Sequence, residues 1–287
     1  MNKLFLLDAY ALIYRSYYAF IKNPRINSKG LNTSAIMGFL NTLQEVLTKE
    51  QPTHLGVAFD PHGPTFRSEA YPAIPILQVD GFEADDVIGT LAAKAGEQGI
   101  DTYMLTPDKD YGQLVGQHVF IYRPRHGGGY EVMGTEEVKS KYAIPSTKAV
   151  IDLLALMGDS ADNFPGCPGV GEKTAVKLIN QFGSIEEMLA RTTEIKGALQ
   201  KKIEEHVEDI RMSKFLATIK TDVPIELDME SLKLVEPDED ELGKLLLELE
   251  MKSFADRVLK KTQKAQKPVN AQLNLFAEFP AENPSLP

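Results

Sequence analysis

The sequence predicts an α/β domain built on a mostly parallel sheet and followed by a helical region. In the first half, short apolar runs alternate with helical patterns, which is typical of parallel strands joined by helices. Beyond about residue 150 the apolar residues recur at helical spacing. The chain has 287 residues, 43% of them hydrophobic, which is enough to bury a sizeable core in one large or two modest domains.

Three short runs, apolar on both faces, are predicted as buried strands, and each leads into aspartate. The runs and the aspartates after them are Leu4–Leu7 with Asp8, Leu55–Phe59 with Asp60, and Thr102–Leu105 with Asp108 and Asp110. Open α/β sheets bind ligands beyond the carboxyl ends of their strands. The sequence therefore predicts a single acidic site at that edge.

The elements that follow are predicted from turn and capping signals. Val119–Tyr122 and Tyr130–Met133 form a hairpin across Gly127–Gly129. A helix face with Val176, Ile179 and Phe182 stops at Gly183, and Ser184 with Glu187 forms a capping box for the next helix. Residues 198–220 and 238–261 continue as amphipathic helices. We expect an α/β core over 1–155, a helical region over 156–261 and a flexible linker over 262–287.

Composition narrows the compartment and the partners. Cys167 is the only cysteine, so no intrachain disulfide can form, which favours the cytoplasm. The N-terminal apolar run, broken by Asp8, is too short and polar for a signal peptide or a membrane span. The formal net charge of −10 argues against a nucleic-acid partner unless the acids are gathered into a cation site.

Nine carboxylates in five segments form such a gathering. The segments are LLDAY, AFDPHG, GFEADD, TPDKD and MGDSADN, and the carboxylates are Asp8, Asp60, Glu83, Asp85, Asp86, Asp108, Asp110, Asp159 and Asp162. Mg²⁺ prefers oxygen ligands, and this set exceeds the needs of one ion. It fits two ions about 3.5–4 Å apart, one to activate water and one to stabilise the leaving oxygen. Few His and no Cys lie near, which argues against zinc.

Each segment also has a simpler interpretation. Asp85 and Asp86 open a helix, where acids stabilise the positive end of the dipole. Asp108 and Asp110 could form a turn, and Asp159 could end a helix. The five segments together, three of them at strand ends, favour the metal site.

GCPGVGEKTA, residues 166–175, lies between two helical patterns. A tight turn through Gly169 and Gly171, followed by a helix N-terminus, can bind a phosphate without reading sequence. Lys173, Thr174 and Lys177 would add side-chain contacts. The alternative is an ordinary corner whose glycines serve packing.

The segment after Asp8 is rich in tyrosine. Arg15 could hold a phosphate, and Tyr17 with Tyr18 could stack on a frayed base. These tyrosines, with Tyr14, could equally pack a helix against the sheet, and the sequence leaves both interpretations open.

These segments, in this order, resemble the 5′ nuclease family that includes the N-terminal nuclease domain of bacterial DNA polymerase I and the flap endonucleases. The resemblance runs from about Leu4 to Lys261. It implies a PIN-like core with a helix-hairpin-helix (H3TH), and two-metal hydrolysis at 5′ flaps, nicks and RNA-primed DNA ends. It also implies two Mg²⁺ ions, which Mn²⁺ can replace, a K⁺ ion at the hairpin, a location at the bacterial nucleoid, and a polymerase following in the full-length protein.

The resemblance assigns roles to individual residues. Those of the tighter metal site would be Asp8, Asp60, Glu83, Asp85 and Asp108. Those of the second ion or its waters would be Asp86, Asp110, Asp159 and Asp162. Arg67 resembles a position that meets the scissile phosphate, although it could be a structural ion-pair partner; Lys94 is a second candidate cation or else a surface helix residue. Alternatives are a freestanding flap endonuclease, a weakly catalytic DNA-binding or clamp-recruiting module, and a PIN-type ribonuclease, which would not need the hairpin.

The sequence departs from the family at two places. After FRSEAYP the family continues with a Tyr–Lys–x–x–Arg stretch and two helices that form an arch over single-stranded DNA, whereas here Pro72 is followed at once by Ala73. Either the arch is deleted or this sequence omits it; a covalent Pro72–Ala73 bond would place the two Cα atoms about 3.8 Å apart. Pro107 stands where the family usually has glycine, with the carboxylate spacing unchanged.

The C-terminal segment carries a short apolar island. Gln272, Leu273, Leu275 and Phe276 resemble the QLxLF peptides that bind the bacterial sliding clamp. The alternative is a hydrophobic linker into a following domain.

Overall fold

A computed structural model of the chain describes residues 2–61, 74–125, 127–159 and 163–265. Arg67, Asp162, the Pro72–Ala73 bond and the four residues of the clamp peptide lie outside these ranges. The chain divides into two compact units, Met1–Pro237 and Asp238–Pro287, which differ from the three-part division expected from sequence. No helix in the described ranges is long and apolar enough to span a membrane.

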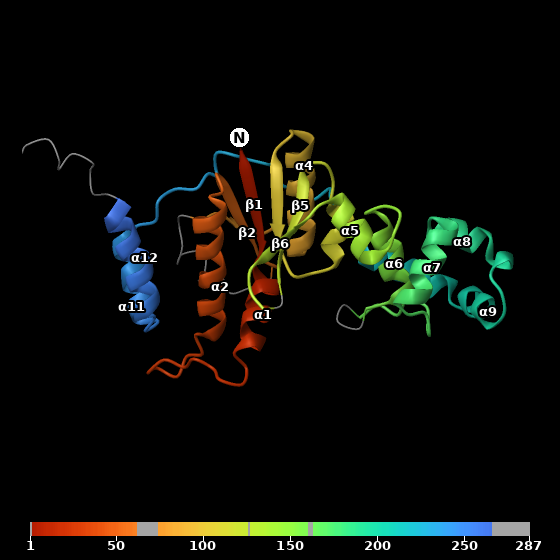
Figure 1. Ribbon diagram of the computed structural model, residues 1–287, viewed down its shortest axis with the longest axis horizontal. Coiled ribbons are helices and arrows are strands. Elements are labelled where there is room, and N and C mark those ends of the chain that lie inside the picture. Colours follow the sequence, from red (N-terminus) through yellow and green to blue (C-terminus); the bar gives the residue numbers. More distant parts are fainter. Residues whose placement is uncertain (1, 62–73, 126, 160–162, 266–287) are drawn as a thin grey trace, which may run out of the picture. The chain divides into compact units, whose positions relative to one another are not determined.

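A six-stranded sheet forms the centre of the first unit (Figure 1). Its order is β3-β2-β1-β4-β5-β6, and β5–β6 is its one antiparallel pair. The strands are β1 Lys3–Asp8, β2 His54–Ala58, β3 Ile76–Leu77, β4 Asp101–Leu105, β5 Val119–Pro124 and β6 Tyr130–Met133. The predicted fold class, the three predicted strands and the hairpin are confirmed.

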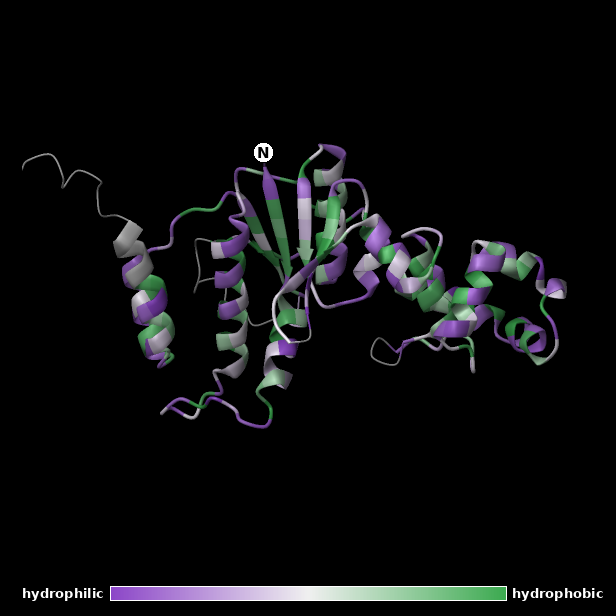
Figure 2. Ribbon diagram, viewed as in Figure 1, coloured by the Kyte–Doolittle hydropathy of each residue, from purple (hydrophilic) through white to green (hydrophobic). Residues whose placement is uncertain are grey.

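The sheet is covered on both faces because its strands alternate their apolar side chains. Leu4 and Leu6 pack with α4, Ala84–Glu97. Phe5 and Leu7 pack on the other face, where α1, Ala9–Ala19, and α2, Ser34–Glu45, lie, followed by the π-helical turn Val46–Glu50. Figure 2 shows hydrophobic residues concentrated in the strands and polar residues on the outer helix faces. This layering places the ends of β2, β1 and β4 side by side at one edge.

The chain changes direction at β1. It passes from β1 to β2 and β3 on one side, and then returns to place β4 on the other side of β1. The register sets Leu7 of β1 opposite Leu105 of β4, and Asp8 opposite Ala58 of β2. The crevice at the carboxyl ends of β1 and β4 is therefore the switch point at which such sheets bind ligands.

The helical region of the first unit follows the β5–β6 hairpin. Its helices are α5 Thr135–Tyr142, α6 Ala149–Met157, α7 Glu172–Phe182, α8 Ile185–Ala190, α9 Ala198–Glu205 and α10 Val207–Ala217, with a short 3-10 turn Thr192–Glu194 after α8. Gly183, at φ 86°, ends α7 as predicted, and the Ser184 side chain accepts the Glu187 amide at 3.2 Å. The amphipathic stretch 198–220 is two helices that meet at His206.

The second unit is a pair of helices, α11 Glu239–Glu248 and α12 Lys252–Ala265. The Asp238 side chain caps α11 by accepting the amides of Asp240 and Glu241. Glu250, at φ 59°, ends it, and the Met251 amide donates to the Leu246 carbonyl at 2.8 Å. This left-handed stop divides the predicted stretch 238–261.

Helix α4 ties the segment after α10 to the sheet. Side chains on three successive turns of α4 form hydrogen bonds with the backbone of residues 220–225. Asp86 Oδ1 accepts the Lys220 amide at 2.7 Å, and Thr90 Oγ1 accepts the Val223 amide at 3.1 Å. Lys94 Nζ donates to the Ile225 carbonyl at 2.6 Å. Lys94 therefore has a structural bond, about 13 Å along the helix from the acidic first turn. It is not placed to act as a cation at the site.

Gln113 is a second tie, in the 3-10 helix η2, Asp110–Leu114. This side chain is 1% exposed; it donates to the carbonyls of Asp110 and Ala217, at 3.0 and 2.9 Å, and accepts the Ile219 amide at 3.0 Å. It thus joins the sheet edge to the end of α10.

Gln113→Leu should lower the free energy of unfolding by about 2–3 kcal/mol, because it leaves buried backbone groups without partners. Urea unfolding measures this. Gln98→Leu, at an exposed position after α4, is the control and should change stability by less than about 0.5 kcal/mol. Equal effects of the two changes would contradict the prediction.

Candidate metal centre

Among the described carboxylates of the predicted site, Asp8 is the most buried, at 7% exposed. It ends β1 and caps α1, with Oδ1 accepting the Ala11 amide at 3.0 Å. Its Oδ2 accepts from the hydroxyls of Thr106 and Tyr111, each at 3.1 Å. Burial raises the pKa of Asp8 to about 6 despite these bonds. In the described part of the chain no Lys or Arg forms an ion pair with Asp8, and a bound cation would supply such a counter-charge.

Asp85 and Asp108 lie close enough to Asp8 to interact with it. Burial raises the pKa of Asp85 to about 7, and the charges of Asp86, Glu83 and Asp8 raise it further. Asp108 likewise raises the pKa of Asp8. Tyr111, 1% exposed, has its pKa raised by burial and then by the charges of Asp8, Asp85 and Asp108. The structure therefore brings these three carboxylates together around one buried phenol.

Backbone amides position the neighbouring carboxylates. Asp60 Oδ1 accepts the Ala84 amide at 2.8 Å, so the end of β2 meets the start of α4. Glu83 is the exposed N-cap residue of that helix. Asp108 Oδ1 accepts the Asp110 amide at 3.0 Å. The Thr106 hydroxyl accepts the Asp108 amide at 3.1 Å while donating to Asp8, which links the two acids.

The acids expected at the second ion face other partners. Asp86 accepts the Lys220 amide, as described above. Asp159 forms an ion pair with Lys109, the lysine between Asp108 and Asp110 in sequence. Sequence reasoning did not single out Lys109, since its partner is 50 residues away.

The residues fit hard divalent cations. Within the described ranges, no group of three or more Asp, Glu, His or Cys side chains is arranged to hold a metal ion. Mg²⁺ does not need one, because it commonly binds one or two carboxylates and completes its shell with water and substrate phosphates. The donors at this edge are carboxylate oxygens, two of them on desolvated groups with raised pKa values. This chemistry suits Mg²⁺ or Mn²⁺.

The raised pKa values predict how metal-free stability depends on pH. The carboxyls of Asp8 and Asp85 bind protons more tightly folded than unfolded, so their contribution is present at low pH and is lost as pH rises through about 6 and 7. Mg²⁺ should therefore stabilise the protein more at pH 8 than at pH 5. Thermal unfolding with Mg²⁺ and with EDTA measures the difference, in which groups remote from the site cancel; an equal Mg²⁺ effect at both values would contradict the prediction.

The predicted tight turn before α7, Glu172–Phe182, is present. The Val170 amide donates to the Cys167 carbonyl at 2.9 Å, with Pro168 second and Gly169 third at φ 81°, as in a type II turn. Gly171 is the N-cap residue of α7. Gly169, Gly171, Lys173 and Lys177 are exposed, and Thr174 is half-buried.

Packing accounts for one glycine of this motif but not for another. A Cβ at Gly166 would lie 2.3 Å from the Gly158 amide nitrogen, so Gly166 serves close packing. A Cβ at Gly171 would meet nothing within 4 Å. The alternative of an ordinary packed corner therefore does not explain Gly171.

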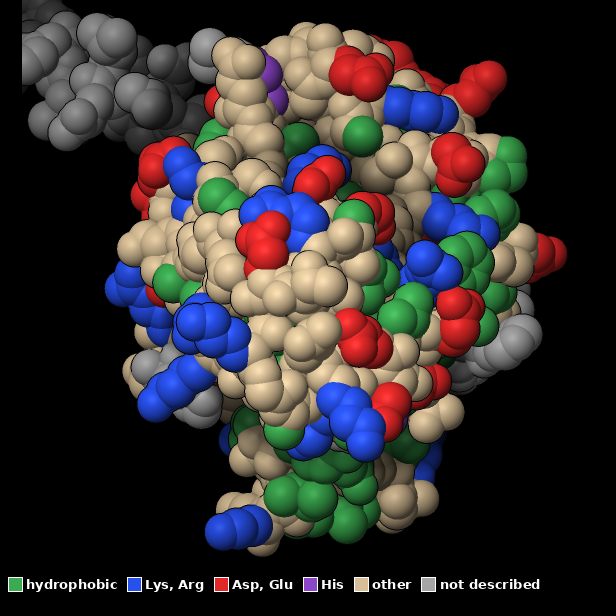
Figure 3. Space-filling model, turned by 90° about the vertical axis from the view of Figure 1, so that its right-hand side faces the viewer, with side chains coloured by type: hydrophobic (Ala, Val, Ile, Leu, Met, Phe, Trp, Pro, Cys, Tyr) green, Lys and Arg blue, Asp and Glu red, His purple; other side chains and the backbone are tan. Residues whose placement is uncertain are grey.

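Lys202 of α9 lies beside the turn Cys167–Val170, and sequence reasoning did not single it out. Its Nζ lies over the turn, 2.7 Å from where a Cβ of Gly169 would be. No local motif marks it, because a different helix supplies it. Figure 3 shows Lys and Arg side chains spread over the face presented by the helical region, with Asp and Glu side chains between them.

Three of the four tyrosines of α1 do not pack against the sheet, whereas Tyr10 is half-buried with its ring centroid 6.0 Å from that of Phe59. Tyr14, Tyr17 and Tyr18 are 57%, 42% and 63% exposed, while Ala9, Leu12 and Ser16 form the buried face. Arg15 is exposed and lines a cavity of about 210 Å³ with residues of α2 and with Tyr130 of β6. The exposure leaves these side chains available for a ligand.

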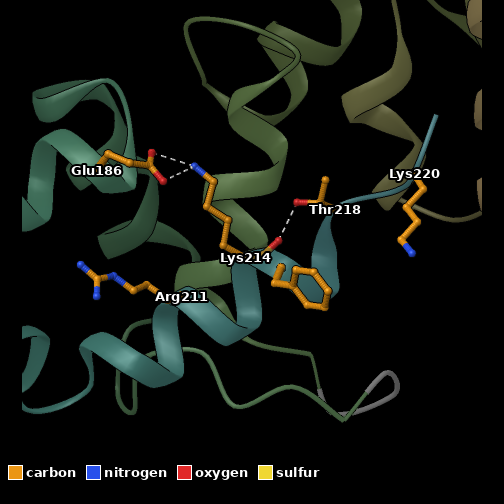
Figure 4. A pocket seen from close by; sticks show the side chains of 6 residues that line it. Glu186, Arg211, Lys214, Thr218 and Lys220 are labelled. Atoms are coloured by element: carbon orange, nitrogen blue, oxygen red, sulfur yellow. Dashed lines mark hydrogen bonds and ion pairs between the residues drawn. The ribbon is translucent and has the colours of Figure 1, made fainter. Parts of the chain in front are cut away.

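A larger cavity of about 320 Å³ lies along α10. Figure 4 shows its lining side chains: Glu186, Arg211, Lys214, Phe215, Thr218 and Lys220. Lys214 is held by two carboxylates, and Phe215 is 70% exposed. One of the lining residues, Lys220, also donates its backbone amide to Asp86 of α4.

Comparisons with known proteins match both halves of the chain. The profile of the N-terminal resolvase-like domain of the 5′-3′ exonucleases matches residues 3–74 and again 72–143, and that of their C-terminal SAM-fold domain matches 145–240. A 5′-3′ exonuclease from Aquifex aeolicus is 35% identical over 285 residues, covering 90% of this chain and 96% of that protein. DNA polymerase I of Bacillus caldotenax is 36% identical over 298 residues, covering 93% of this chain.

The chain spans about a third of the length of its DNA polymerase I relatives, 34% for the Bacillus caldotenax protein. That alignment is longer than the part of this chain it covers, so the relative has residues that this chain lacks. The two N-terminal matches meet at residues 72–74, where the arch would be expected.

Solved structures share the fold at low sequence identity. The T5 D15 protein, co-crystallised with metal ions, aligns over 90% of this chain and 99% of its own with a TM-score of 0.59 and 16% identity. The catalytic core of Rad2, in complex with DNA substrate, aligns over 85% and 86% with a TM-score of 0.57 and 18% identity.

A resolvase-like sheet with carboxylates at its switch point, joined to a SAM-like helical domain, defines the class of 5′ nucleases. Both domain profiles and a relative matched over nearly its whole length place the protein within that class. The chain belongs to the 5′-3′ exonuclease family.

Proposed function

We propose that this member of the family is a structure-specific nuclease that hydrolyses phosphodiester bonds at 5′ flaps, nicks and RNA-primed ends of DNA. This is the reaction needed for primer removal and nick translation in replication and repair. The observation that carries the proposal is the meeting of Asp8, Asp85 and Asp108, from three different elements, at the switch point of the sheet. Family membership supports the reaction class.

Two divalent cations, Mg²⁺ with Mn²⁺ as a substitute, would supply an activated water and charge neutralisation at the scissile phosphate. The residues proposed to hold the tighter ion are Asp8, Asp60, Glu83, Asp85 and Asp108. Those proposed for the second ion are Asp86, Asp110, Asp159 and Asp162. Arg67 is proposed to contact the scissile phosphate.

Hydrogen bonds to the carboxylate oxygens hold Asp8 and Asp108 in place. The hydroxyls of Thr106 and Tyr111 hold Asp8, and the Asp110 amide holds Asp108. Such partners fix the orientation of ligands before an ion binds. No protein nucleophile is needed.

The helical region is proposed to hold duplex DNA by its backbone. Gly169 and Gly171 expose the turn and the α7 N-terminus, Lys173, Thr174 and Lys177 extend from α7, and a K⁺ ion would bind at the turn. Lys202 adds a positive charge over the same turn. Arg15 and Tyr17 are proposed to contact a frayed end by phosphate binding and stacking.

Two partners beyond DNA are proposed. One is a polymerase, which we propose follows this segment in the full-length protein, because the chain spans 34% of relatives named DNA polymerase I. The peptide of Gln272, Leu273, Leu275 and Phe276 is proposed to bind the sliding clamp; deleting 272–276 should abolish clamp binding and spare cutting of free flaps. The setting we propose is the bacterial cytoplasm, at the nucleoid.

The proposal is tested by incubating the protein with a labelled 5′-flap duplex and Mg²⁺. Parallel reactions contain EDTA or the Asp85→Ala, Asp108→Ala double variant. Cleavage at the flap junction that is lost in both controls is the expected result. Tight flap binding without cutting would instead support a DNA-binding or clamp-recruiting module, the second candidate, which a true deletion of the arch between Pro72 and Ala73 would favour.

A further inference from the structure

Lys109 is a positive charge inside the acidic edge that the proposed reaction does not use. It lies between Asp108 and Asp110, at the start of the 3-10 helix η2. Its Nζ forms an ion pair with Asp159 Oδ2, although 50 residues separate the two. The pair joins the loop after β4 to the segment that leads from α6 toward the turn Cys167–Val170.

We propose that Lys109 neutralises Asp159, one of the proposed ligands of the second ion, in the metal-free protein, and that it is displaced when a divalent cation binds this carboxylate. The inference rests on the proposed two-ion function. It assigns Lys109 a positioning role, because Lys109 acts on the ion through Asp159.

Burial makes a counter-charge necessary. The Asp159 side chain is 13% exposed, and an ionised carboxylate so covered is costly unless it is paired. The Lys109 ammonium supplies that counter-charge through its ion pair with Asp159.

The side chain is also able to leave. Its 38% exposure shows that the stem reaches the surface, so the ammonium can move into water without unpacking the core. A lysine ammonium is a compact charge on a flexible stem, whereas an arginine would hold the carboxylate with two fixed bonds. A displaceable partner is what a site needs if it must remain folded without metal and still accept an ion.

Competition for Asp159 has a definite sign. An ion that binds Asp159 must break the pair with Lys109 and approach a positive charge, so Lys109 weakens second-ion binding. The binding of the tighter ion, at Asp8, Asp85 and Asp108, is weakened less, because this ion does not have to break the pair between Lys109 and Asp159. A lysine that instead held a substrate phosphate would strengthen DNA binding and leave ion binding in free protein to the carboxylates.

Calorimetric titration with Mg²⁺ and with Mn²⁺, without DNA, tests the inference. We compare wild type with Lys109→Gln, Lys109→Arg and Lys139→Gln. The last removes the same charge from an exposed pair with Glu136 and serves as control. In Lys109→Gln the second ion should bind about tenfold tighter and the first within about twofold. Lys109→Arg should bind the second ion no more tightly than wild type, and the control should match wild type.

Other outcomes overturn the inference. Unchanged or weaker binding of the second ion in Lys109→Gln would contradict the inference. Loss of flap binding in Ca²⁺, with ion affinity unchanged, would also contradict it, because Lys109 would then be a phosphate contact. Thermal unfolding in EDTA checks folding of each variant, and Lys109→Arg keeps the charge if Lys109→Gln unfolds. Wild type that binds no divalent ion would refute the proposed function itself, whereas two ions insensitive to Lys109 would refute only this inference.

Discussion

Asp8→Asn should reduce flap cleavage by at least about a thousandfold and yet stabilise the metal-free protein at pH 8. The loss follows because the change removes a ligand charge at the centre of the ion site, and a thousandfold corresponds to about 4 kcal/mol of transition-state stabilisation. The gain follows because burial raises the pKa of Asp8 to about 6, so the folded state disfavours the charge present at pH 8.

The hydrogen bonds of Asp8 survive the substitution in altered form. The asparagine oxygen can still accept the Ala11 amide. The hydroxyls of Thr106 and Tyr111 now donate to the other carboxylate oxygen, and each can instead accept from an amide NH₂. The side-chain volume is unchanged, so neither cavity nor overpacking should obscure the electrostatic gain.

Single-turnover cleavage in Mg²⁺ and thermal unfolding in EDTA measure the two effects. Asp101→Asn is the matched control, since Asp101 starts β4 at the opposite end of the strand and pairs with His118 at 2.8 Å. We expect it to retain cleavage and to gain no stability. Retained cleavage in Asp8→Asn would remove Asp8 from the site, and a loss of metal-free stability would show that its charge is already compensated.

The strand-end carboxylates were predictable because local sequence determines them. Asp8, Asp60 and Asp108 each follow a run whose apolar residues must be buried, and parallel strands bring their carboxyl ends to one edge. The hairpin was predictable for a similar reason, since Pro168-Gly169 specifies a type II turn within four residues.

What could not be predicted depends on partners distant in sequence. Asp85 and Asp86 are adjacent, but successive helix residues point about 100° apart, and only the fold shows that Asp86 accepts the Lys220 amide while Asp85 lies close enough to Asp8 to feel its charge. Lys109 and Lys202 acquire their roles from Asp159 and Gly169, which other elements supply. The sequence left open whether Tyr14, Tyr17 and Tyr18 are exposed, because this depends on how α1 is rotated against the sheet.

Lys214→Met should destabilise the protein by about 3–5 kcal/mol, the cost of leaving a buried carboxylate unpaired. Lys214 of α10 lies 2.6 Å from Asp152 of α6 and 2.8 Å from Glu186 of α8, as Figure 4 shows for Glu186. Asp152 is 6% exposed, and burial raises its pKa even with Lys214 beside it. The lysine thus supplies the charge that lets three helices pack around this acid.

Urea unfolding of a double-variant cycle separates the pair from its environment. Asp152→Leu combined with Lys214→Met should recover most of the loss, because two apolar side chains replace the pair and no buried charge is left alone. Lys201→Met, which breaks an exposed pair with Glu205, should cost less than about 1 kcal/mol. If Lys214→Met were equally mild, Asp152 would have to be neutral or solvated in the folded state, and the packing of α6, α8 and α10 would rest on apolar contacts alone.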